Sequence, residues 1–230
     1  MNLFYQPTIA EGIDHLDAEE SRHAVRVLRM TEGSLLDVTD GKGFFYSCQI
    51  TKADPKKCVF KIVEKKNIPQ RKYKTHVAIA PTKNIDRTEW FVEKAVEIGI
   101  DEISFLLCKN SERKAINLER IKKIAVSAMK QSQQAWLPKL NAIVPFAKIF
   151  NELADQKFIA HVDTANRVHL KSAAQPEKKY LVLIGPEGDF SKEELTLAFE
   201  HDFEKVSLGA NRLRTETAAL VAVQILRLIN

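Results

Sequence analysis

The chain has 230 residues, a net charge of +5 and an apolar fraction of 45%, values that are ordinary for a globular protein and exclude a disordered or collagen-like chain. At roughly 100–200 residues per domain, this length predicts one large domain or two smaller ones. The longest uncharged apolar stretch, 217–226, is shorter than the roughly 20 residues of a membrane span. No apolar segment follows Met1, so no signal peptide is expected.

Three cysteines, Cys48, Cys58 and Cys108, are scattered along the chain. They form neither a CxxC motif nor a Cys/His spacing, so the sequence predicts no metal site and no disulfide framework. Free thiols are typical of a reducing compartment. We therefore expect a cytoplasmic protein with neither a membrane nor a metal as a partner.

The first part of the chain is predicted to hold one helix and several short strands. Asp17 can N-cap a helix over 18–29, with Val25 and Leu28 on its apolar face. The Asp40–Gly43 segment is typical of a hairpin turn between two strands. The strand-like runs cover 34–39, 43–51 and 57–64. One helix with several short strands predicts a small β-rich barrel.

A basic segment then separates this part from the rest. Residues 52–74 carry nine basic and two acidic side chains, whereas residues 1–51 carry four and eight. Such a density of positive charge is typical of nucleic-acid binding, although lysines also protect exposed strand edges. The polar stretch 64–74 resembles a linker, which predicts domains at 1–70 and 71–230.

After the linker, apolar runs alternate with helical patterns, which predicts an α/β fold with a parallel sheet covered on both faces. The predicted strands cover 76–80, 103–107, 157–162, 180–184 and 205–208. The predicted helices cover 86–98, 117–134, 191–200 and 215–229. No P-loop, Rossmann glycine motif, HExxH or GxSxG is present, which disfavours a metabolic enzyme with a nucleotide cofactor.

A glycine-containing turn, GPEGDFS, begins at Gly185 between a predicted strand and a helix. Ligands of open α/β sheets bind at the carboxyl ends of strands. Ser191 and Glu194 form a capping box, and Glu187 and Asp189 add negative charge. Because phosphate sites need free amides, this turn favours a neutral or cationic ligand; the alternative is an ordinary turn.

A second turn follows the last predicted strand, with the sequence SLGANRLRTETA over 207–218. Gly209 permits a sharp bend, and Thr215 is predicted to N-cap the final helix. Arg212 and Arg214 at a strand's carboxyl end are candidates for binding a polyanion or a developing negative charge.

Together, IGPEGDFS and LGANRLRTETA resemble the paired C-terminal signatures of SPOUT-class RNA methyltransferases, and in particular of the RsmE family, which makes 3-methyluridine in small-subunit (16S) ribosomal RNA. Asp189 stands where that family usually has glycine, and Asn211-Arg212 shifts a basic position by one place. Other segments of the chain also resemble the family: His23, Val27-Leu28-Arg29, Gly33, Asp40-Gly41, Pro81-Thr82-Lys83, Arg87-Thr88-Glu89-Trp90, Glu93-Lys94, Glu97-Ile98-Gly99, Ser111-Glu112-Arg113 and Gln131-Ser132.

The resemblance implies a PUA-like RNA-binding barrel over 1–70 and, over 71–230, a SPOUT-type parallel sheet with a C-terminal trefoil knot. S-adenosylmethionine would bind at loops near His161–Asp163, Ile184–Phe190 and Leu208–Arg214, and its cationic sulfonium agrees with the acidic turn. The candidate cofactor-binding residues are His161, Ile184, Gly185, Glu187, Gly188, Leu208, Gly209 and Leu213.

Methylation of uridine N3 requires the loss of the N3 proton, which leaves an anionic uracil. A cation near O2 or O4 would stabilise this anion; Arg214 is the first candidate and Arg212 the second. The predicted catalytic residues also include Glu216. The base that removes the N3 proton is predicted to be one of three carboxylates, Glu187, Asp189 or Glu216, or else solvent. Because N3 lies on the pairing edge, the uridine must be unpaired or flipped.

The candidate RNA contacts are basic side chains at motif positions: Arg22, His23, Arg26, Arg29, Lys83, Arg87 and Arg113. Glu89, Glu93 and Glu97 repel one another at i, i+4 spacing. We expect nearby cations to offset this repulsion, either in a surface network or in an arrangement that directs them toward RNA. Those cations are Lys83, Arg87, Lys94 and Arg113.

The final helix is apolar around most of its circumference, which predicts a second buried side and therefore a homodimer with a two-fold contact. The expected partner is small-subunit ribosomal RNA or the assembled 30S subunit. Two alternatives remain: a non-catalytic RNA-binding protein on the same scaffold, and a SPOUT methyltransferase with another RNA target.

Overall fold

The computed structural model describes residues 3–161 and 168–230. The chain divides into two compact units, residues 1–70 with 126–137 and residues 71–125 with 138–230. The predicted boundaries put 126–137 in the second domain, but this segment groups with the first unit because it binds there. The indole of Trp136 donates to the carbonyl of Ile68 at 3.0 Å, and a Cβ on Gly43 would lie 2.2 Å from the Trp136 ring, so only glycine fits.

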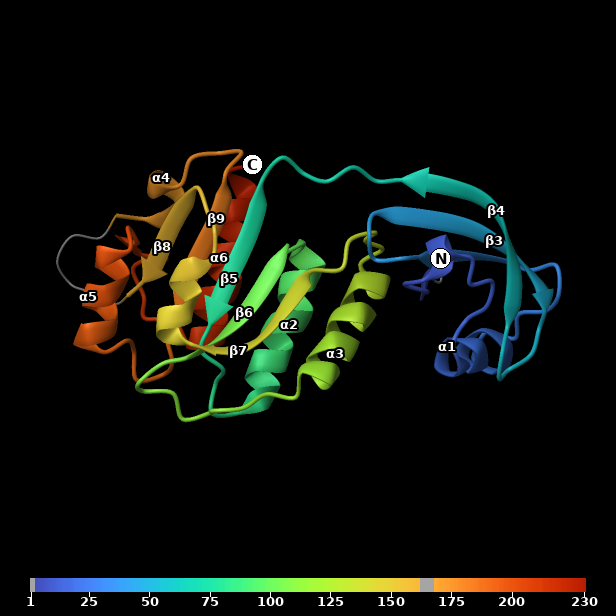
Figure 1. Cartoon of the computed structure of the whole chain (residues 1–230), viewed down its shortest axis with the longest axis horizontal. Helices are drawn as coiled ribbons and strands as arrows, with labels where there is room; N and C mark the ends of the chain where they lie inside the picture. Colours follow the sequence, from blue (N-terminus) through green and yellow to red (C-terminus); the bar gives the residue numbers. More distant parts are fainter. Residues whose placement is uncertain (1–2, 162–167) are drawn as a thin grey trace. The chain divides into compact units, whose positions relative to one another are not determined.

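The first unit holds a four-stranded sheet in the order β1-β2-β3-β4 (Figure 1). Its strands are β1 (Leu3–Tyr5), β2 (Leu35–Thr39), β3 (Phe44–Lys52) and β4 (Val59–Asn67). β1, which was not predicted, pairs parallel to β2, and the other pairs are antiparallel. The small β-rich domain that the sequence predicts is present as one four-stranded sheet. Leu16, Val38 and Tyr46 lie in its core.

The predicted helix over 18–29 is shorter and less regular in the structure. Helix α1 (Ala18–Arg22) begins as predicted, since the Asp17 carboxylate accepts from the Glu20 amide at 2.8 Å. It continues as a π-helix, η2 (His23–Val27). The backbone then turns at Arg29, which has a φ of 55°.

The second unit holds a six-stranded, wholly parallel sheet in the order β10-β8-β9-β5-β6-β7 (Figure 1). The predicted α/β class is confirmed. The strands are β5 (Lys74–Ile79), β6 (Glu102–Leu107), β7 (Lys139–Pro145), β8 (Gln156–Ala160), β9 (Lys179–Ile184) and β10 (Glu204–Val206). The helices are α2 (Ile85–Ile98), α4 (Leu170–Ala173), α5 (Lys192–Glu200) and α6 (Thr215–Leu228), with the 3₁₀ segment η3 (Phe146–Asn151). Helix α3 (Leu118–Gln131) belongs to this unit up to Ala125 and to the first unit after it.

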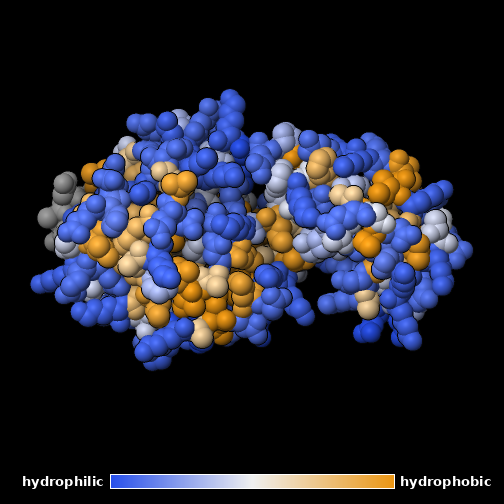
Figure 2. All heavy atoms as spheres, viewed as in Figure 1, coloured by the Kyte–Doolittle hydropathy of each residue, from blue (hydrophilic) through white to orange (hydrophobic). Residues whose placement is uncertain are grey.

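Helices cover both faces of this sheet. α6 packs on β5 and β9 and against α2, whereas η3 and α5 pack on the other face through a core that includes Phe146, Phe190 and Ala198. In the view of Figure 2 most of the surface is hydrophilic, and apolar side chains gather on the viewed face of the second unit. None of the described helices has the length and apolar character of a membrane span.

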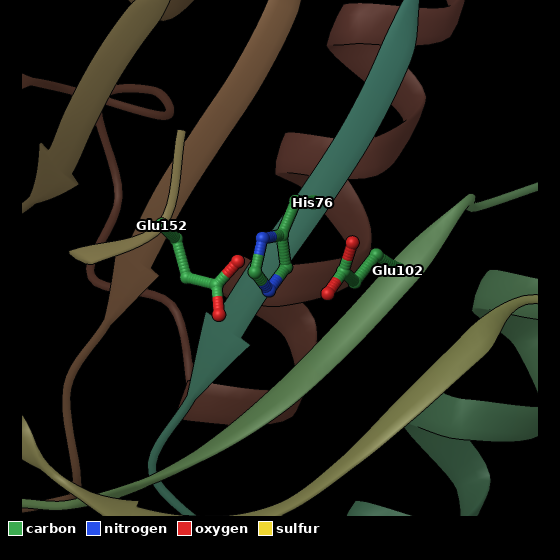
Figure 3. A group of neighbouring side chains, drawn as sticks. All are labelled: His76, Glu102 and Glu152. Carbon is green, nitrogen blue, oxygen red and sulfur yellow. The ribbon is translucent and has the colours of Figure 1, made fainter. Parts of the chain in front are cut away.

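A polar cluster with one buried and two half-buried side chains lies at the amino ends of the central strands. The imidazole of His76 on β5 lies between the carboxylates of Glu102 and Glu152 (Figure 3) and is 2.8 Å from the Ser104 hydroxyl. Burial lowers the pKa of His76 to about 4, so the ring is neutral at pH 7. Glu102 accepts a hydrogen bond from Lys139 at 2.8 Å. These contacts tie β5, β6 and β7 together at the end of the strands that faces away from the loops described below.

Candidate functional site

Four neighbouring strands end side by side at the carboxyl edge of the sheet. The register pairs Val206 with Ala160, Ala160 with Ile184, and Ile184 with Ile79. Because the strands are parallel, the loops that follow β10, β8, β9 and β5 all begin at this edge. The two turns singled out in the sequence are therefore brought together by sheet pairing, although 22 residues separate Gly185 from Ser207.

Two adjoining cavities lie among these loops. One of about 270 Å³ is lined by the β9–α5 loop, the start of α6 and Arg87. The other, of about 260 Å³, is lined by the loop that follows β10 and by His161. Both are lined by Ala160, Arg212, Leu213 and Ala218.

Most predicted site residues line one of these cavities. The first cavity includes the predicted cofactor residues Ile184, Gly185, Glu187 and Leu213 and the predicted catalytic residues Arg212, Arg214 and Glu216. The second includes His161, Leu208, Gly209 and Leu213. Gly188 lines neither cavity. The rest of the predicted loop His161–Asp163 lies outside the described residues.

Gly188 has a structural reason to be glycine. The Asn110 side chain donates to the carbonyls of Gly188 and Asp189 at 3.2 and 3.1 Å. A Cβ on Gly188 would lie only 3.3 Å from the Cβ of Asn110. The glycine thus lets the loop that follows β6 approach the β9–α5 loop.

The predicted role of Thr215 as a helix cap is wrong. The N-cap position of α6 is Arg214, which makes no side-chain capping bond. The Thr215 hydroxyl instead donates to the carbonyl of Gly185 at 3.1 Å. It therefore ties the start of α6 to the β9–α5 loop, a contact that helical capping patterns do not predict. The predicted capping box of Ser191 and Glu194 is confirmed.

Asp189 has a backbone conformation that suits glycine. Its φ is 61°, in the left-handed region that Asp and Asn tolerate better than other side chains because they hydrogen-bond locally. The Asp189 carboxylate accepts from the amide of Phe190 at 2.8 Å. Its second oxygen lies 2.9 Å from Nδ1 of His161, a nitrogen that has no well-aligned hydrogen bond to any described group.

The three carboxylates of the first cavity differ in how they are held. Glu187 accepts a hydrogen bond from the amide of Lys83 at 2.9 Å, and Asp189 is bound within its own loop. Glu216 is buried, with 6% of its surface exposed. Its carboxylate lies 4.0 Å from Nε of Arg87 and makes no hydrogen bond within the described residues.

Arg212 and Arg214 are exposed, and neither forms an ion pair with any other described residue. By contrast, the predicted RNA contact Arg113 donates to the carbonyls of Thr82 and Lys83 at 3.0 and 2.7 Å. The free positive charge of the first cavity therefore comes mainly from the two arginines of the last loop.

The acidic row on α2 is neutralised differently from the expected pattern. Lys94 contacts Glu93 and Glu97 at 2.7 and 2.8 Å, as expected. The Glu89 carboxylate instead accepts hydrogen bonds from Nε and Nη2 of Arg120, at 2.5 and 2.8 Å. The sequence prediction missed Arg120 because it belongs to α3. Lys83, expected to offset these carboxylates, pairs with Glu112 at 2.8 Å.

The remaining predicted RNA contacts belong to the first unit. Arg22, His23, Arg26 and Arg29 are all exposed on and after α1. Their side chains are therefore accessible to a polyanion.

The parallel α/β sheet with cavities at its carboxyl edge, beside a C-terminal helix, agrees with the SPOUT-class RNA methyltransferase domain that the sequence signatures imply. The model of the RNA methyltransferase domain matches residues 69–227, and that of the RNA methyltransferase PUA domain matches residues 16–63. The chain belongs to this family, and within it to the RsmE ribosomal RNA methyltransferases.

Individual relatives agree with this assignment. A solved structure described as a probable rRNA methyltransferase of Porphyromonas gingivalis is 42% identical, with a TM-score of 0.93 over 100% of this chain and 98% of that one. A methyltransferase of Legionella pneumophila, solved with S-adenosylmethionine bound, is 28% identical, with a TM-score of 0.87 over 99% and 97%. The ribosomal RNA small subunit methyltransferase E of Buchnera aphidicola is 29% identical over 91% of this chain and 86% of its own.

Proposed function

We propose that this RNA methyltransferase is a cytoplasmic enzyme that transfers a methyl group from S-adenosylmethionine to N3 of one uridine in small-subunit ribosomal RNA. The observation that carries the proposal is the meeting of two cavities at one edge of the sheet with two arginines that pair with no described carboxylate. The relatives support it, since one was solved with this cofactor and another is named for the small ribosomal subunit.

The residues at the cavities suit the cofactor. The cavity beside the β10 loop is lined by small or apolar residues such as Leu208, Gly209 and Ala210, which suits a flat aromatic base. The adjoining cavity carries Glu187, Asp189 and Glu216, which suit a sulfonium cation. When bound, S-adenosylmethionine supplies the electrophilic methyl group. The trefoil knot remains a prediction of the family resemblance.

The protein's own groups then act on the uracil. Arg214, with Arg212 as the second candidate, stabilises the negative charge that uracil acquires when N3 is deprotonated. Of the three carboxylates, Glu216 is our choice for the base, because Glu187 and Asp189 each already accept a backbone hydrogen bond. Solvent is the alternative acceptor.

Incubation of the purified protein with methyl-labelled S-adenosylmethionine and either free small-subunit RNA or assembled 30S subunits tests the proposal. Label in RNA from either substrate supports it, and the better substrate identifies the physiological form. Failure to label either one, while RNA binding persists, would favour the non-catalytic RNA-binding alternative.

We also propose a two-fold dimer formed through α6. Ala219, Ala222, Val223 and Leu226 are buried in the unit, but Leu228 is 74% exposed. Val221 and Ile225 are half-buried on the same side of the helix as Leu228. A second copy would cover this stripe, and the basic side chains of its segment 52–74 could present RNA to the neighbouring cavities.

Sedimentation at micromolar concentration should therefore give about twice the 26.1 kDa chain mass. Ile225→Glu should shift the protein to monomer, because it places a charge in the buried contact, whereas Leu153→Glu, at a residue outside this helix that is 94% exposed, should leave the dimer unchanged. A wild-type monomer that still methylates RNA would contradict the dimer proposal.

The basic segment 52–74 should contribute to RNA affinity. Lys65→Glu, Lys66→Glu and Lys72→Glu should each weaken binding and reduce the slope of log affinity against log salt by about 0.7–0.9 for each phosphate that is no longer neutralised. Lys72 should contribute least, because it already lies 3.4 Å from Glu177. Lys171→Glu on α4 is the control, because it makes the same change of charge outside this segment. A salt slope that stays at the wild-type value in all three variants would leave the segment as a solvated strand edge.

A further inference from the structure

Trp90 on α2 is a large aromatic side chain that remains 42% exposed. The next two residues of the helix, Phe91 and Val92, are fully buried, so the core of the unit is filled without Trp90. Burial of a tryptophan is favourable, and the exposed part of this ring is available for a contact outside the unit.

The surroundings of Trp90 indicate the chemistry of that contact. Its ring lines a depression of about 290 Å³ together with Asp86, Arg87, Arg214, Glu216 and Thr217. All of these neighbours are charged or polar, so the depression is poorly suited to an apolar protein segment. A flat ring beside two guanidinium groups suits a nucleobase that carries a phosphate.

The depression adjoins the first cavity, because Arg87, Arg214 and Glu216 line both. A ligand that stacks on Trp90 would therefore lie next to the groups assigned to the reaction. A uridine taken out of its RNA helix loses its stacking neighbours, and an aromatic side chain can replace them.

We propose that Trp90 is the stacking platform for the target uracil, which makes this depression a nucleobase subsite of the enzyme. The inference rests on the proposed function. It assigns Arg87 to the phosphate beside the flipped uridine and leaves Arg214 for the base itself.

Replacement of Trp90 tests this subsite. Trp90→Ala should lower kcat/KM for RNA by roughly tenfold to a hundredfold, with unchanged S-adenosylmethionine affinity, and Trp90→Phe should restore most of the loss because it keeps an aromatic face. Phe199→Ala is the matched control, since Phe199 on α5 is a similarly exposed aromatic residue, at 47%, that does not line the depression. Wild-type kinetics in Trp90→Ala would overturn the proposal.

Fluorescence gives a readout that is independent of turnover. The chain has two tryptophans, so the emission that disappears in Trp90→Ala defines the Trp90 signal. That signal should be quenched by an RNA hairpin that contains the target uridine, and much less by the same hairpin with an abasic site there. Equal quenching by both hairpins, or a signal that changes with protein concentration and not with RNA, would overturn the subsite; the second result would place a copy of the chain over Trp90.

The two proposals fail separately in these experiments. Uridine-dependent quenching without any methyl transfer would contradict the proposed activity and leave the base contact standing. Normal methylation by Trp90→Ala would contradict the base contact alone.

Discussion

Replacement of Gly209 by valine should abolish S-adenosylmethionine binding while the protein stays folded. The φ of Gly209 is +144°, which side chains rarely adopt, and a Cβ built there meets nothing within 4 Å. The substitution thus adds no clash with the protein and costs only backbone strain, of the order of 1–3 kcal/mol. Relief of that strain would, however, move the backbone of the loop that lines the cavity. Calorimetry should show at least a roughly hundredfold loss of cofactor affinity, about 3 kcal/mol.

Gly33→Val is the matched control for this prediction. Gly33 has a φ of +87°, again with nothing within 4 Å of a Cβ added to it, but it belongs to the first unit. It should be strained to a similar degree and keep its affinity for the cofactor. A folded Gly209→Val protein that binds S-adenosylmethionine normally would show that this loop is not the cofactor site.

Arg214→Ala should lower the rate of methyl transfer by roughly 10²–10³-fold, the usual effect of removing one group that stabilises a developing anion. The affinities for S-adenosylmethionine and RNA should change little, because the proposed contact forms fully only when uracil loses its proton. Single-turnover rates measured at saturating RNA and cofactor separate this effect from binding.

Arg212→Ala provides the comparison for Arg214→Ala, since both arginines are exposed and line the first cavity. We expect a smaller loss of rate from Arg212→Ala. If Arg214→Ala instead weakened RNA binding and left the single-turnover rate unchanged, Arg214 would be a phosphate contact and its assigned role would be wrong.

Periodicity and turn signals predicted most elements of this fold. The strands at β5, β6, β8 and β9 and the long helices follow from apolar patterns of sufficient length. Strand β1 has three residues, too few for any pattern to be visible. Strand β7 lies at the edge of the sheet and has no fully buried residue. Its apolar run, residues 142–144, is short and is followed by Pro145, a residue that disfavours a strand.

The position of the site was also predictable, because the carboxyl ends of parallel strands share one edge. The individual contacts that shape the site were not predictable from the sequence. The bond from Thr215 to Gly185 and the pairing of Glu89 with Arg120 join segments about 30 residues apart, beyond the reach of local patterns. The depression at Trp90 likewise exists only because α2 packs against α6.

We propose that this chain methylates N3 of one uridine in small-subunit ribosomal RNA. Mass spectrometry of nucleosides and RNase fragments from that RNA, prepared from cells with and without the protein, tests it most directly. We expect 3-methyluridine at one position in RNA from cells that contain the protein, unmodified uridine at that position in cells that lack it, and restoration of the methyl group by wild-type protein but not by Arg214→Ala. The same set of modified nucleosides in both RNAs would contradict the account.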